Sequence, residues 1–215
     1  MLYNDSNLWE NYMKHVLFYE GDRDTDPDDT ASKCVQPGQV HTVHGVTFCV
    51  FKSDAARLGI TPVTYERFLK TSNAEATKFL YDSYKRVNGS KYPDSIALAL
   101  TEAAWMSFYP RAATHLKDAL SEFGIITNNE AERQAGAQKL NERLLFDEYV
   151  KQRTAFLNKL INSKTGKWKK YKNGWLNRQK KFYETFRPSG IGEEKKKSGS
   201  GFTTLADIIN NLFNR

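Results

Sequence analysis

The sequence predicts a mainly helical protein with one small β hairpin and a short amphipathic helix tethered at its C-terminal end. Apolar residues recur at helical spacing through most of the 215 residues. Residues that favour helix caps precede several of these stretches. The alternation typical of a strand occurs at residues 46–50, where Val46, Phe48 and Val50 are separated by polar or small residues.

The composition suits a folded globular protein. Hydrophobic residues make up 40% of the chain and charged residues 27%, a balance that argues against general disorder. The formal net charge of +7 favours anionic partners, and it does not distinguish a cell wall from a nucleic acid. The sequence has no apolar run of about 20 residues that would span a bilayer and starts without a recognisable secretory signal. We therefore expect no transmembrane segment and no signal peptide.

The cysteines and histidines give little sign of a metal centre. Two cysteines, Cys34 and Cys49, are too few for a disulfide scaffold. One bridge between them can form, but unpaired thiols are favoured in a chain without a secretory signal. His41 and His44 lie near both cysteines, yet their spacings fit no standard zinc pattern. We expect no metal and no cofactor.

The first 60 residues predict a helix, an acidic loop and a hairpin. Asn7 is a candidate cap for a helix whose apolar face ends at Glu20, just before Gly21. A tight turn is predicted at Asp26-Pro27-Asp28 in the acidic loop that follows. The alternating residues 46–50 then predict a short strand within a small sheet or hairpin.

The rest of the chain predicts helices, each with a start signal or an apolar face. Proline is tolerated at a first helical position, and Ser or Thr followed three residues later by Glu forms a capping box. The first of these helices begins at Pro62, and the second begins at Ser72, with Glu75 completing its capping box. A buried central helix covers 96–108 and is ended by Pro110, and another helix covers 112–123. The last is a long helix that begins at Thr127, with Glu130, and runs through Leu157.

Residues 164–186 alternate cations with aromatic rings and have two interpretations. In the favoured one, Trp175, Phe182 and Phe186 pack the last helix on the core while the lysines face water. In the other, the stretch binds an extended anionic polymer, glycan or nucleic acid, by charge and stacking.

A carboxylate at a helix end followed by an acidic loop is a candidate catalytic arrangement. Glycosidases use one carboxyl group that stays protonated as an acid and another that stays ionised. Glu20, at the end of an apolar helix, is placed for partial burial, which favours its protonated form. Asp26 and Asp29 lie in a polar loop and should stay ionised. The alternative is that these acids only serve solvated turns.

The same residues resemble the motifs of glycoside hydrolase family 108, which contains phage endolysins and related bacterial N-acetylmuramidases. The resemblance covers about residues 7–187. It is carried by two groups of residues in the family's order. These are Glu20-Gly21, Asp26-Pro27-Asp28-Asp29 and Thr42 to Thr47 near the start, and Gly174-Trp175-Leu176-Asn177-Arg178, preceded by Arg153, near the end.

The resemblance implies a mainly α, lysozyme-like α+β domain that cleaves the β-1,4 glycosidic bond of bacterial peptidoglycan. Glu20 corresponds to the general acid, and Asp29 and Thr42 to the residues that stabilise the developing charge or position water. The remaining implied site residues would bind substrate. These are Asp26, His44, Glu102, Trp105, Trp175 and Arg178.

Several positions depart from the family pattern. Asp22-Arg23 replace a Gly-Tyr pair, the Gly pair after the acidic turn is missing, and His44 replaces a Tyr. Met106 and Phe108 stand where the family has Asn and Gly. These departures leave a second interpretation open, a catalytically weak or inactive lysozyme-like structural protein of a phage virion.

The C-terminal part has its own organisation. We predict a lysozyme-like domain over 1–187, a linker over 188–201 and an amphipathic helix within 202–215. The apolar stripe over 202–213 suits docking onto virion proteins or folding back onto its own domain. The resemblance implies peptidoglycan as the partner, no nucleic acid, and a location in the host cytoplasm until lysis or in the phage virion.

Overall fold

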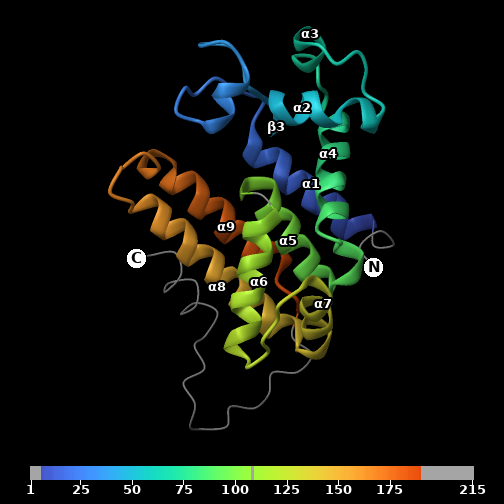
Figure 1. The fold of residues 1–215 in the computed structure, drawn as a ribbon, viewed down its shortest axis with the longest axis vertical. Helices are drawn as coiled ribbons and strands as arrows, with labels where there is room; N and C mark the ends of the chain where they lie inside the picture. Colours follow the sequence, from blue (N-terminus) through green and yellow to red (C-terminus); the bar gives the residue numbers. More distant parts are fainter. Residues whose placement is uncertain (1–5, 108, 190–215) are drawn as a thin grey trace. The chain divides into compact units, whose positions relative to one another are not determined.

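The computed structural model describes residues 6–107 and 109–189 (Figure 1). The chain divides into two compact units, 1–87 (unit 1) and 88–215 (unit 2). The predicted class is confirmed, because helices dominate the described residues and the strands among them form one small antiparallel sheet. The predicted linker (188–201) lies almost wholly outside the described residues, and the C-terminal helix (202–215) lies entirely outside them.

Unit 1 combines a helix pair with the sheet and several short helices. In chain order its described elements are α1 (Ser6–Glu20), β1 (Arg23–Asp24), the 3-10 helix η1 (Thr30–Cys34), β2 (Thr42–Val43), β3 (Val46–Thr47), α2 (Phe48–Asp54), the 3-10 helix η2 (Ala56–Leu58), α3 (Tyr65–Phe68) and α4 (Asn73–Arg86).

Helices α1 and α4 hold unit 1 together through aromatic rings. Trp9 of α1 contacts Tyr81 and Tyr84 of α4, with ring centroids 5.8 and 5.6 Å apart. The predicted capping box at the start of α4 is confirmed, with Ser72 and Glu75 each accepting a hydrogen bond from the other's backbone amide. Helix α1 ends at Glu20 as predicted. This places the Glu20 side chain where the chain leaves the helix for the sheet.

The sheet has strand order β1-β2-β3, and all neighbouring strands are antiparallel. The predicted hairpin is confirmed as β2–β3, in which Val43 pairs with Val46. Its two turn residues, His44 and Gly45, have φ values of 47° and 79°. Positive φ at both central positions is what type I′ hairpin turns require.

The predicted cap at Asn7 is wrong, because α1 already includes Ser6. Two other predicted boundaries in unit 1 are wrong because side-chain caps start helices there. The predicted strand over 46–50 ends at Thr47, whose hydroxyl accepts a hydrogen bond from the Val50 amide and starts α2. The helix predicted from Pro62 begins only at Tyr65, after the cap residue Thr64.

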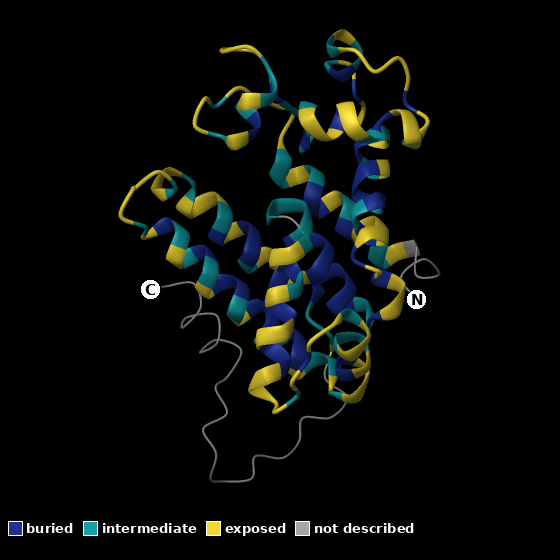
Figure 2. Cartoon of the chain, viewed as in Figure 1, coloured by how far each residue is buried: buried dark blue, intermediate teal, exposed yellow. Residues whose placement is uncertain are grey.

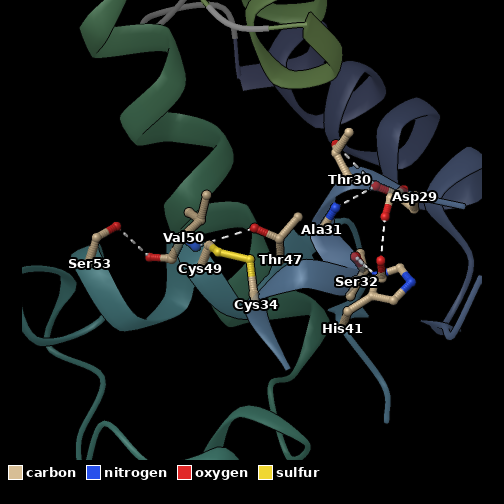
Figure 3. The surroundings of a disulfide bond; sticks show 11 residues. Asp29, Thr30, Ala31, Ser32, Cys34, His41, Thr47, Cys49, Val50 and Ser53 are labelled. Carbon is tan, nitrogen blue, oxygen red and sulfur yellow. Dashed lines mark hydrogen bonds between the residues drawn. A yellow bond between two sulfur atoms is a disulfide. The ribbon is translucent and has the colours of Figure 1, made fainter. Parts of the chain in front are cut away.

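A disulfide bond joins Cys34 to Cys49 with a Cα–Cα distance of 5.4 Å (Figure 3). The expectation of unpaired thiols is therefore wrong. The bond connects the end of η1 to the first turn of α2. The 15-residue separation that it closes contains the whole β2–β3 hairpin.

Unit 2 is a bundle built around α5, in which Ser95 to Ala103 are all buried (Figure 2). This confirms the predicted buried central helix. Helices α6 and α8 pack against α5. Among the described residues, no helix combines the length and apolar character needed to cross a bilayer. The described elements are the 3-10 helix η3 (Gly89–Lys91), α5 (Asp94–Ser107), α6 (Tyr109–Glu122), α7 (Glu130–Lys139), α8 (Glu142–Ile161), the 3-10 helix η4 (Lys169–Tyr171) and α9 (Lys172–Phe186).

The single long helix predicted from Thr127 is two helices. Asn129 caps α7 through the Glu132 amide, and Asn141 caps α8 through the Leu144 amide. The chain is extended between them, at Leu140. Two asparagine caps therefore separate what the apolar pattern predicted as one helix.

Candidate active site

Glu20 lies at the end of α1 with its side chain directly over the hairpin turn. It is half-buried, as predicted. A Cβ atom added at Gly45 would lie 2.6 Å from the Glu20 Cγ and 2.9 Å from its Oε2. Because real Cβ contacts essentially never come that close, a side chain at position 45 would displace the Glu20 side chain from where it lies. The fold thus places the predicted general acid against the turn that follows Thr42.

Asp29 and Asp26 build the acidic loop. Asp29 is the N-cap of η1, and its Oδ1 accepts a hydrogen bond of 2.8 Å from the Ala31 amide (Figure 3). The Asp29 amide donates to the Asp26 carbonyl at 3.0 Å, which confirms the predicted tight turn. One Asp29 carboxylate oxygen is therefore used as the cap of η1, and this hydrogen bond orients the carboxylate.

His41 joins Thr42 to the acidic loop. It is fully buried, its Nδ1 lies 2.9 Å from the Thr42 Oγ1, and its Nε2 lies 3.1 Å from the Asp26 carbonyl oxygen. A carbonyl only accepts, so a neutral ring carries its proton on Nε2 and accepts the Thr42 hydroxyl at Nδ1. The lone pairs of the Thr42 oxygen then remain available to accept a hydrogen bond from water.

Asp24, Asp29 and His41 form a cluster that sequence reasoning missed. One ligand-type atom from each lies within 4.8 Å of the others, a spacing that can hold a metal ion. Their polar atoms already form hydrogen bonds within the protein. Asp24 Oδ1 accepts one from the Asp26 amide at 2.8 Å, and the His41 ring forms one with the Thr42 hydroxyl. From the sequence alone, His41 stands out only as a possible zinc ligand that fits no standard spacing. Its position directly before Thr42 was the signal that could have linked it to the site.

His44 lies in the hairpin turn and lines an open pocket of about 640 Å³ within unit 1. Its Nδ1 lies 3.7 Å from an Asp22 carboxylate oxygen, so a protonated ring would form an ion pair there. Neither Glu20 nor Asp29 lines this pocket. The lining residues are Asp22, Arg23, Val43, His44, Leu69, Lys70 and Thr71.

Glu102 and Arg178, predicted to bind substrate, form a buried ion pair inside unit 2. Glu102 has no exposed surface, and Arg178 Nε and Nη2 donate to its two carboxylate oxygens at 2.6 and 3.1 Å. The Arg153 Nη2 lies 3.9 Å from the same carboxylate. This geometry gives the three residues a structural explanation, because it ties α9 and α8 to the central helix.

The two predicted tryptophans are half-buried. Trp105 lies in the last turns of α5. Trp175 lies in the first turns of α9, where its ring stacks on Tyr171 with centroids 5.4 Å apart and an interplanar angle of 10°. It also packs on the apolar cluster between α8 and α9.

The chain has a structural relative but no match by sequence. No protein-family model matches it, and no curated protein matches it. The solved structure of SagA from Brucella abortus is similar, with a TM-score of 0.63 and 19% sequence identity. The similarity covers 85% of this chain and 97% of that one. At this identity the similarity shows a shared fold.

Proposed function

We propose that this chain is a peptidoglycan hydrolase, an N-acetylmuramidase that cleaves the β-1,4 bond with Glu20 as general acid. The observation that carries the proposal is the contact between the Glu20 carboxyl group and Gly45. This contact brings a half-buried carboxyl group beside the hairpin that bears Thr42 and His44, and so supports the proposal.

The chemistry needs a proton donor and a second group that supports the developing cation or the attacking water. Glu20 supplies the proton to the leaving oxygen. Thr42, held by the buried His41, has an oxygen free to orient a water molecule. Asp29 supplies negative charge through the carboxylate oxygen that does not cap η1.

The pocket beside His44 suits the charge of the polymer. Arg23 and Lys70 contribute two cations to it beside the carboxylate of Asp22. The peptides of peptidoglycan carry carboxylates. We assign this pocket to a part of the substrate next to the cleaved sugar.

The test is the Glu20→Gln variant on purified peptidoglycan, with the release of reducing ends as readout. Loss of a positioned general acid should lower the rate by about 10²- to 10⁴-fold. The matched control is Glu10→Gln on the same helix, where the exposed Glu10 pairs only with Lys14 among the described residues.

Glu20→Gln activity within a few-fold of the wild type would contradict Glu20 as the acid. A folded wild-type protein that releases no reducing ends would contradict hydrolysis itself. That second result would favour the alternative, a lysozyme-like structural protein of a phage virion.

A further inference from the structure

The sequence from 149 to 183 contains no aspartate or glutamate and eleven lysines and arginines. Three of these cations pair with acidic side chains of the protein. Arg153 and Arg178 are buried against Glu102, and Lys151 pairs with Glu148 at 2.9 Å. The remaining eight are all lysines.

Five of these lysines lie in the segment 164–172, which connects α8 to α9 and which we call the lysine loop. All five are exposed. Lys164, Lys167, Lys169 and Lys172 form no ion pair with any acidic side chain among the described residues. The fifth is Lys170, whose ammonium lies over the Tyr171 ring. The loop therefore concentrates positive charge, and the described residues do not neutralise the charges of Lys164, Lys167, Lys169 and Lys172.

An aromatic cluster accompanies these charges. Trp168, Tyr171 and Trp175 contact one another with centroid distances of 5.4 to 6.0 Å. Trp175 also packs on the apolar cluster formed by Leu157, Ile161 and Leu176. The rings are thus fixed to the helix pair, and all three keep part of their surface in solvent.

Amphipathic rings beside lysines are typical of a surface that meets lipid headgroups. Trp and Tyr prefer the bilayer interface, and clustered lysines are attracted to anionic lipids. Single-stranded nucleic acid fits less well, because base stacking needs an open ring face. Here Trp175 covers one face of Tyr171, and Lys167 and Lys170 lie over Trp168 and Tyr171. The loop also lacks arginine, the residue best suited to bidentate phosphate contacts.

We propose that the lysine loop and its aromatic cluster bind the surface of an anionic phospholipid bilayer. This site lies within unit 2 and does not depend on the proposed hydrolase activity. The lysines supply attraction to the headgroup phosphates, and the exposed parts of Trp168 and Tyr171 enter the headgroup layer.

The test is co-sedimentation of the full chain with phosphatidylcholine vesicles that contain or lack phosphatidylglycerol. We expect binding only with phosphatidylglycerol, weakened by added salt. The triple variant Lys167→Glu, Lys169→Glu, Lys172→Glu should lower the affinity by at least about tenfold. The matched control changes three exposed lysines elsewhere by the same total charge: Lys78→Glu, Lys117→Glu, Lys139→Glu.

The Trp168→Ala variant tests the aromatic part and should weaken binding while the charge stays constant. Equal losses in the two triple variants would overturn the proposal, because net charge alone would then explain binding. Absence of binding, or equal binding to both kinds of vesicle, would also overturn it. Tighter binding to single-stranded DNA that is lost in the loop variant would replace the lipid with a nucleic acid.

Discussion

At the scale of single residues, the candidate site depends on Gly45. This residue combines a positive φ with a position at which an added Cβ would lie only 2.6 Å from the Glu20 Cγ. A side chain at this position would clash with the Glu20 side chain as that side chain now lies. Gly45 therefore couples the conformation of the hairpin to the position of the proposed acid.

We predict that Gly45→Ala lowers the proposed muramidase activity by more than its effect on stability explains. The left-handed backbone costs a non-glycine residue about 1–2 kcal/mol, and the added Cβ would also displace Glu20. Activity per folded molecule and the free energy of unfolding measure the two effects separately.

Gly38→Ala is the control for this prediction. Gly38 has a φ of +80°, close to that of Gly45, but an added Cβ would have no neighbour within 4 Å. It should lose similar stability and keep its activity. Equal activity in both variants would show that Gly45 does not position Glu20.

At the scale of secondary-structure elements, the ion pair between Glu102 and Arg178 ties α9 to α5. The sequence showed both residues but not their pairing, since 76 positions separate them. Burial of both partners changes what a substitution does, because removing the Glu102 charge deprives two buried arginines, Arg178 and Arg153, of the carboxylate that they share.

We predict that Glu102→Gln destabilises the protein by about 3–5 kcal/mol, because Arg178 and Arg153 would lose their shared carboxylate. Urea unfolding measures this loss. Glu148→Gln, which breaks a contact with the exposed Lys151, should cost less than about 1 kcal/mol. If Glu102→Gln proved as stable as the wild type but bound substrate poorly, the substrate-binding role implied by the sequence would be the better explanation.

At the scale of the whole molecule, the disulfide bond is the one covalent crosslink among the described residues. It closes a segment that contains His41, Thr42 and the hairpin turn. The constraint therefore acts on unit 1, and on the part of it that carries the proposed site.

We predict that the double variant Cys34→Ser, Cys49→Ser is less stable by about 3 kcal/mol, the value expected for a closed loop of this length. Thermal unfolding with and without a thiol reductant measures it. The reductant should destabilise the wild type and leave the double variant unchanged. A wild type that does not respond to complete reduction would contradict this role of the bond.

Element boundaries could be predicted where a local cap decides them and failed where caps were overlooked. The Ser72 and Glu75 capping box is confirmed, while Asn129 and Asn141 divide a helix that the apolar pattern predicted as continuous. At Thr47 a hydroxyl cap ends the strand although the alternation of apolar residues continues. The spacing of apolar residues indicates which side chains are buried, whereas a cap residue indicates where a helix begins.

The sequence by itself determined the helical class, the hairpin, and the placement of Glu20 at a helix end, because spacing and capping act between neighbours in the chain. Only the tertiary structure decided that Glu20 lies over Gly45, that His41 contacts the Asp26 carbonyl, and that Glu102 pairs with Arg178. These contacts join residues whose partners are chosen by packing and by the cost of leaving buried polar groups unsatisfied. Both the packing and this cost depend on which residues the fold brings together, and the order of residues along the chain does not show that.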